Sequence, residues 1–77
     1  MEAWDIFAEI QEELKRATLI HGSPFRSAHE GWAIIREEVD ELWDEVKSDY
    51  RMITKMRREA IHVAAMALRF IQDVCDG

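Results

Sequence analysis

Apolar residues recur at helical spacing in three stretches of the chain, and no stretch shows the strict alternation of a β-strand. The spacing predicts helices over residues 2–20, 28–47 and 50–75. The apolar face of the first helix would consist of Trp4, Phe7, Ile10, Leu14 and Ala17. The pattern therefore predicts one all-α domain, a three-helix bundle that spans residues 1–77.

The breaks between these helices carry their own signals. Gly22 can end the first helix, and Pro24 cannot continue it. Ser27 and Glu30 read as a capping box, in which the serine hydroxyl accepts from the Glu30 amide and the glutamate reaches back. Residues 48–49 predict a turn and the N-cap of the third helix. Because this connection is short, we expect the second and third helices to be antiparallel neighbours, with the first packed across them.

The apolar faces are wide for so short a chain. The second helix carries Trp32, Ile35, Val39, Leu42, Trp43 and Val46. The third is expected to bury Met56, Ala60, Val63, Ala64, Ala67, Phe70, Ile71 and Val74. A chain of 77 residues is marginally stable alone, and its one cysteine, Cys75, has no partner for a disulfide within the chain. We therefore expect a homodimer or homotetramer that covers the remaining apolar surface.

The charge balance narrows the classes of partner. A net charge of −6 and a pI near 4.9 disfavour binding to nucleic acid or to anionic membranes. The longest apolar run, residues 60–71, is too short to span a bilayer and contains His62 and Arg69. Glu2 and Asp5 stand where a signal peptide would be basic, so a cytoplasmic location is expected.

Acidic residues crowd the second helix and fall on two sides of it. At about 100° per residue, three point to solvent and three line the flank of the apolar stripe. The solvent group is Glu37, Asp40 and Asp44, and the flanking group is Glu38, Glu41 and Glu45. Like charges one turn apart repel each other, and partial burial increases that cost. A bound cation would remove the penalty.

The third helix offers partners for two of the flanking carboxylates. If the turn is centred near Tyr50, facing residues have numbers that sum to about 100. Glu41 then faces Glu59, and Glu38 faces His62, in each case beside the shared core. Four such side chains could converge on one point, and oxygen-rich sites of this kind suit Mg²⁺.

A simpler interpretation of the same residues remains open. Acidic helix flanks are commonly solvated surfaces. Glu59 could pair with Lys55 or Arg58 on its own helix, without any cation.

The two acidic motifs resemble a known family. Glu37-Glu38-x-x-Glu41, followed by Glu59-x-x-His62, resembles the EExxE…ExxD pattern of the MazG-like, all-α nucleoside triphosphate pyrophosphohydrolase superfamily. Residues 29–32 and 59–66 are also similar to a compact bacterial and phage group of this family. The resemblance implies a helical bundle that dimerises or tetramerises. It also implies hydrolysis of an NTP or dNTP to its monophosphate and pyrophosphate.

The resemblance also implies roles for individual residues. Glu38, Glu41 and Glu59 match the Mg²⁺ ligands, with Glu37 as an outer ligand or helper, and Glu38 and Glu41 match the catalytic carboxylates. The sequence departs from the pattern at His62, where the family has aspartate. Imidazole suits Mg²⁺ poorly and Mn²⁺ better, so the site would be weakened, retuned or inactive. Alternatively, His62 only hydrogen-bonds Glu38 across the hairpin.

Further residues are candidates for contact with a nucleotide. Lys55, Arg58 and Arg69 could meet phosphates, although solvated cations are the commoner interpretation. Phe25 and Trp32, near the first connection, could stack on a base, although such rings are more often core. The alternative to an enzyme is a non-catalytic helical interaction or regulatory module, and a small acidic DNA mimic would also suit the charge.

Overall fold

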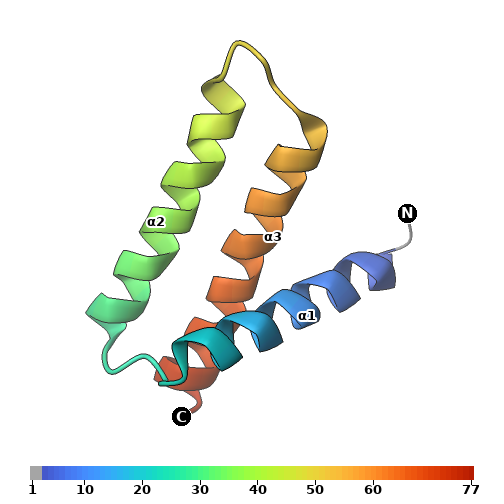
Figure 1. The fold of residues 1–77 in the computed structure, drawn as a ribbon. Coiled ribbons are helices and arrows are strands. Elements are labelled where there is room, and N and C mark those ends of the chain that lie inside the picture. The colour runs from blue at the N-terminus through green and yellow to red at the C-terminus, as the bar shows by residue number, and fades with distance from the viewer. Residues whose placement is uncertain (1–2) are drawn as a thin grey trace.

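The computed structural model describes residues 3–77, which form three helices, α1 (Ala3–His21), α2 (Ala28–Lys47) and α3 (Ile53–Phe70), and a short π-helix, η1 (Ile71–Cys75). Figure 1 shows α2 and α3 as an antiparallel hairpin, with α1 crossing α3. Residues 3–77 contain no strand, so the predicted all-α architecture of three helices is confirmed. The start predicted at Glu2 and the side chain of Trp4 lie outside the described parts.

The first connection follows the predicted signals closely. Gly22 ends α1 with φ of 70°, and its amide donates to the carbonyl of Thr18 at 2.8 Å. The Ser27 hydroxyl accepts from the Glu30 amide at 3.1 Å, as the capping box requires. The Glu30 carboxylate accepts from the Arg26 amide at 3.2 Å instead of the amide of Ser27. Both side chains therefore fix the entry into α2.

The predicted start of the third helix is wrong. α3 begins at Ile53, with Met52 in the N-cap position and no side-chain cap. Ser48 instead ends α2, and its hydroxyl accepts from the amide of Tyr50 at 3.2 Å, which holds the turn. At the other end the α-helix stops at Phe70, and the predicted continuation to Cys75 is a π-helix.

A glycine lets the open end of the hairpin, opposite the turn, pack tightly. A Cβ atom on Gly31 would lie 2.5 Å from a ring carbon of Phe70 and 3.1 Å from one of Phe25. Both rings therefore lean on the bare backbone of α2 at this point. The most buried apolar residues gather nearby and are Ala17, Phe25, Ala65 and Met66.

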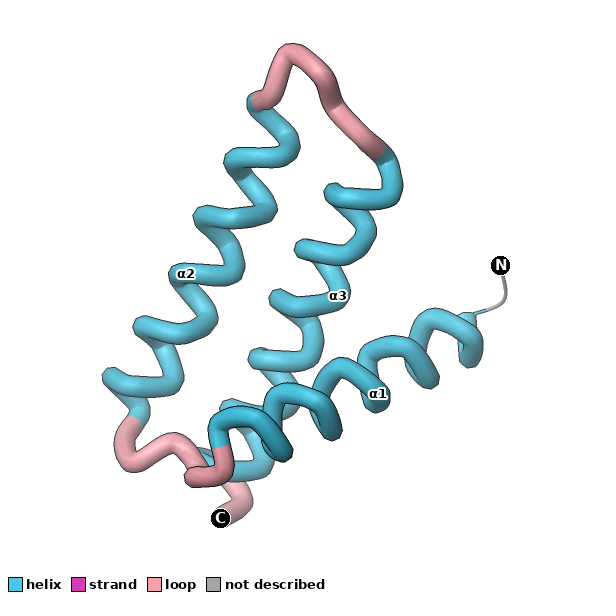
Figure 2. The backbone as a smooth tube through the Cα atoms, in the orientation of Figure 1, coloured by secondary structure: helices cyan, strands magenta, loops and turns pink. Residues whose placement is uncertain are grey.

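The apolar face predicted for the third helix is only partly covered. α1 packs against α3 (Figure 2). Ala65 and Met66 of α3 share a buried core with Ala17 of α1. Ala60, Ala67 and Ile71, which were expected in the core, are exposed because no described element lies over them. On α2, Trp32 and Trp43 are likewise 57% and 56% exposed.

Among the described residues, no helix has both the length and the apolar character needed to cross a membrane.

Candidate metal centre

Four side chains meet between the two helices of the hairpin. Glu38 and Glu41 come from α2, and Glu59 and His62 come from α3. One ligand atom from each lies within 4.8 Å of the others. These four side chains are a candidate site for one metal ion, and we call the four residues the metal cluster. The connection of residues 48–52 separates α2 from α3 and is centred on position 50, so the hairpin register expected from the sequence brings them together.

The cluster contains carboxylate oxygens with no hydrogen-bond donor. Oε2 of Glu38 and Oε2 of Glu59 are buried, and no donor among the described residues bonds to them. The Nδ1 atom of His62 lies 3.6 Å from the former and 3.4 Å from the latter. Buried oxygens of this kind are costly to leave unsatisfied, and a cation would satisfy them.

Glu38 is a partly buried carboxyl group surrounded by other ionisable side chains of the cluster. Burial raises the pKa of its carboxyl to about 7, and the neighbouring charge of Glu41 acts in the same direction. The charge of Glu59 raises it further, whereas a positively charged His62 would lower it. Without a cation, Glu38 therefore tends to keep its proton near neutral pH.

This shift predicts opposite pH trends with and without metal. The folded protein holds a proton on Glu38 between pH 4.5 and about 7 that the unfolded chain releases, so metal-free stability should fall as pH rises through that window. Metal must displace this proton, so affinity should rise up to about tenfold per pH unit until about pH 7.

Thermal melts and calorimetry at pH 5.5, 6.5 and 7.5 would measure both trends. Glu38→Gln should flatten the metal-free trend, and Glu37→Gln, on the exposed neighbour, should leave it unchanged. Metal-free stability that rises between pH 5.5 and 7.5 would contradict the shift.

The donor set fits a hard divalent cation. Ligand atoms around one Mg²⁺ lie at most about 4.2 Å apart, so the cluster needs only a small contraction to close on an ion. Three carboxylates suit Mg²⁺ or Mn²⁺, and the one imidazole favours Mn²⁺ over Mg²⁺. Glu59 is only 14% exposed, whereas Glu41 is exposed, so one side of the cluster remains open to a ligand. Glu45, placed on the same flank by its spacing, is not among the four.

The first helix contributes residues that the sequence did not indicate. Oε1 of Glu13 lies 3.4 Å from Nε2 of His62, on the other edge of the ring. The Arg16 guanidinium donates to both oxygens of Glu13 and lowers the pKa of that carboxyl. The available signal was an i, i+3 pair beside the apolar residue Leu14. That signal does not say which helix the pair will face.

The three basic residues predicted to contact phosphates differ in their exposure and in their partners. Lys55 is exposed, and Arg58 is exposed with its Nε 3.8 Å from Oε1 of Glu59. Arg69 is instead 6% exposed, pairs with Asp73 and donates to the carbonyl of Ser23. The structure therefore gives Arg69 a clear role in packing the first connection.

The predicted base contacts also differ from each other. Phe25 is buried, and the guanidinium of Arg69 lies over its ring, 4.3 Å from the centroid. Its backbone amide donates to Asp73 at 3.0 Å. Trp32 is exposed on α2. Phe25 is thus part of the packed interior of the bundle, whereas Trp32 is exposed on its surface.

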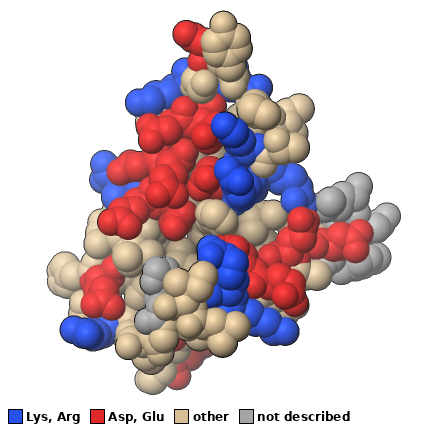
Figure 3. Space-filling view, viewed as in Figure 1, with Lys and Arg blue, Asp and Glu red and all other residues tan. Residues whose placement is uncertain are grey.

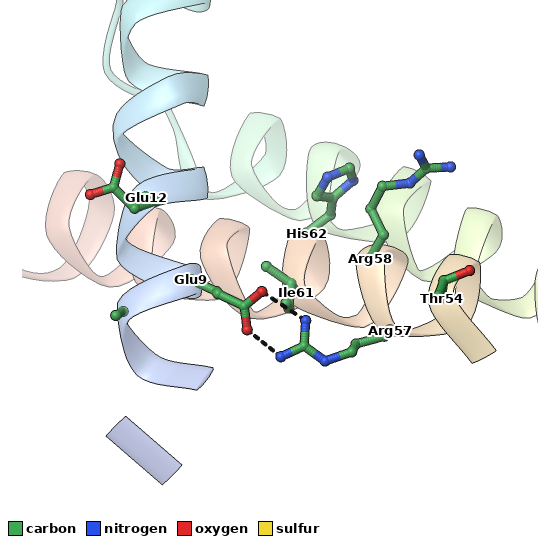
Figure 4. Close-up of a pocket in the computed structure, with 8 residues that line it drawn as sticks. Glu9, Glu12, Thr54, Arg57, Arg58, Ile61 and His62 are labelled. Carbon is green, nitrogen blue, oxygen red and sulfur yellow. Dashed lines mark hydrogen bonds and ion pairs between the residues drawn. The ribbon is translucent and has the colours of Figure 1, made fainter. Parts of the chain in front are cut away.

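Two pockets border the metal cluster. The larger, of about 560 Å³, lies between the three helices and the first connection and is lined in part by Arg16, Arg26, Glu38 and His62. The smaller, of about 410 Å³, lies between α1 and α3 on the other side of His62 (Figure 4). Both volumes are typical of small-molecule sites.

Charges of both signs surround the larger pocket and the cluster. Acidic side chains gather over α2 and again over α1, with basic side chains between them (Figure 3). Beside the smaller pocket, two hydrogen bonds join Glu9 of α1 to Arg57 of α3 (Figure 4). Such a surface can bind a phosphorylated ligand together with its cation.

No family model, curated protein or solved structure matches this chain.

Proposed function

We propose that the chain is a metal-dependent nucleoside triphosphate pyrophosphohydrolase of the MazG-like type, acting on an NTP or dNTP. The observation that carries this proposal is the convergence of the metal cluster, with two buried carboxylate oxygens that receive no hydrogen bond from the described part of the chain. Glu38, Glu41, Glu59 and His62 would hold Mg²⁺ or Mn²⁺. A bound cation would neutralise phosphate charge and orient a water for attack.

Glu38 and Glu41 are the candidates for the catalytic carboxylates. Burial raises the pKa of Glu38 to about 7 in the metal-free protein, and a bound cation would displace that proton, so Glu38 would act there as an ionised ligand that helps to orient the water. Glu41 is the more exposed of the two, so it can contact a ligand that enters from solvent.

The larger pocket is the proposed nucleotide site. Glu38 and His62 lie at its wall, so a phosphate chain there would meet the cluster. The exposed side chain of Arg26 also lines it and supplies a cation for the phosphates. Lys55 and Arg58 remain candidates for phosphates that extend beyond the cluster.

We also propose that the protein is a homodimer or homotetramer. Exposed apolar residues lie on α2, on α3 and at the start of η1, and include Trp32, Val39, Trp43, Val46, Ile53 and Ile71. A second copy placed against this face would complete a four-helix bundle.

Light scattering at micromolar concentration should therefore give at least twice the 9.1 kDa chain mass. Trp43→Glu should shift it to the monomer, because burying an unpaired charge is costly. Glu37→Lys, at an exposed position on α2, serves as the control. A parent protein that remains a 9.1 kDa monomer would contradict the proposed homo-oligomer.

The activity is tested by pyrophosphate release from a panel of NTPs and dNTPs with Mg²⁺ or Mn²⁺. We expect release that requires metal, that Glu41→Gln abolishes, and that Arg26→Gln weakens mainly through a higher KM. Arg36→Gln is the control, because Arg36 is exposed and paired with Asp40 at 3.1 Å. Metal binding without release of pyrophosphate would favour the non-catalytic module.

A further inference from the structure

The imidazole of His62 is held between carboxylates on both of its edges. Nδ1 faces Glu59 and Glu38 at 3.4 and 3.6 Å, toward the metal cluster. Nε2 faces Glu13 of α1 at 3.4 Å, away from it. The two ring nitrogens therefore have different neighbours, and only one of them can serve the cluster.

Glu13 is itself fixed in place. The Nε atom of Arg16 donates to Oε2 of Glu13 at 2.9 Å, and a second guanidinium nitrogen donates to Oε1. This paired geometry orients the carboxylate and keeps it ionised. The side chain of Glu13 is only 14% exposed, so little water competes for it.

An ionised carboxylate only accepts hydrogen bonds, so Glu13 favours a proton on Nε2 of His62. With the proton on Nε2, the lone pair of Nδ1 is directed at the cluster and can bind a metal. A carboxylate behind a ligating histidine commonly fixes its tautomer and ring orientation in this way.

We propose that Glu13, held by Arg16, is a positioning residue that makes Nδ1 of His62 a metal ligand. The inference rests on the proposed metal centre and adds α1 to it. It also gives a physical reason why this chain can use histidine as a ligand at position 62. A histidine needs a neighbour that fixes its tautomer, whereas an aspartate has no tautomer and would need no such neighbour.

The test compares Mn²⁺ and Mg²⁺ affinities, by calorimetry, in Glu13→Gln and in the matched control Glu12→Gln. Glu12 is exposed, pairs with Lys15 at 3.7 Å, and points away from His62 (Figure 4). We expect Glu13→Gln to lose about 10–100-fold in Mn²⁺ affinity, which is the usual effect of removing such a partner. Glu12→Gln should change it little. Arg16→Gln keeps the Glu13 carboxylate but removes the guanidinium that orients it, so it should show a smaller loss of Mn²⁺ affinity.

Loss of a nearby negative charge would also weaken cation binding, so the same change is made in a His62→Asp background. There the charge effect persists, but no ring remains to be oriented. If Glu13→Gln weakens Mn²⁺ binding equally in both backgrounds, Glu13 acts only as a charge and the proposal is overturned. A loss confined to the His62 background supports it.

Nitrogen-15 spectra of the Zn²⁺-loaded protein give a second readout. We expect metal on Nδ1 and a proton on Nε2, and metal on Nε2 would overturn the inference. If the parent binds no divalent metal, the proposed metal centre fails as well. If the parent binds metal and Glu13→Gln behaves like Glu12→Gln, only the role of Glu13 fails.

Discussion

Glu59→Gln should abolish divalent metal binding and at the same time make the metal-free protein more stable. Glu59 is a partly buried member of the metal cluster, and no donor within the described residues 3–77 bonds to its Oε2. Replacing the carboxylate with an amide removes one negative charge beside Glu38 and supplies a donor for it. The relief of repulsion should be worth about 0.5–1 kcal/mol, since solvated pairs cost a few tenths and burial adds to that.

Such a gain corresponds to an increase in Tm of roughly 2–8 °C for a domain of this size. The loss of metal affinity should exceed about 100-fold. Removing only a hydrogen-bond partner of a metal ligand already costs about 10–100-fold, and this change removes a ligand itself. Glu41→Gln should lose affinity similarly but gain less stability, since Glu41 is exposed.

Glu45→Gln is the matched control, because Glu45 lies one turn beyond Glu41 on α2 and outside the metal cluster. Calorimetry and thermal melts without metal would measure the two effects. A Glu59→Gln protein that binds Mn²⁺ like the parent, or that melts lower without metal, would contradict this account of the cluster.

The hairpin could be predicted from the sequence because its information is local. A short connection and two apolar stripes set the register of α2 and α3, and the pairing of Glu38 with His62 follows from it. The capping box at Ser27 also depends only on adjacent residues. The start of α3 was missed because Ser48 can hold a turn as readily as it can cap a helix.

The position of α1 could not be predicted in the same way. The connection after His21 allows several paths, and helical periodicity shows which face is apolar without showing what covers it. The sequence pattern alone therefore does not place Glu13 beside His62. Arg69 was expected at the surface, but its guanidinium stacks on Phe25 and pairs with Asp73, which allows its burial.

His62→Asp should strengthen Mg²⁺ binding by about tenfold and lower the preference for Mn²⁺, because a hard oxygen replaces imidazole in the cluster. Any pyrophosphohydrolase activity should rise with it. In the metal-free protein the same change places a fourth carboxylate near Glu13, Glu38 and Glu59. It should therefore lower stability by roughly 1 kcal/mol before metal is added.

His62→Asn is the control that separates charge from shape. Asparagine has nearly the size of aspartate but no charge, so it should neither gain Mg²⁺ affinity nor lose metal-free stability to repulsion. If His62 serves only as a hydrogen-bond partner of Glu38, His62→Asp would lose stability with no gain in Mg²⁺ affinity. Mg²⁺ titrations and thermal melts on the parent and both variants distinguish these cases. Tighter Mg²⁺ binding in His62→Asp alone would mark position 62 as a ligand of the metal cluster.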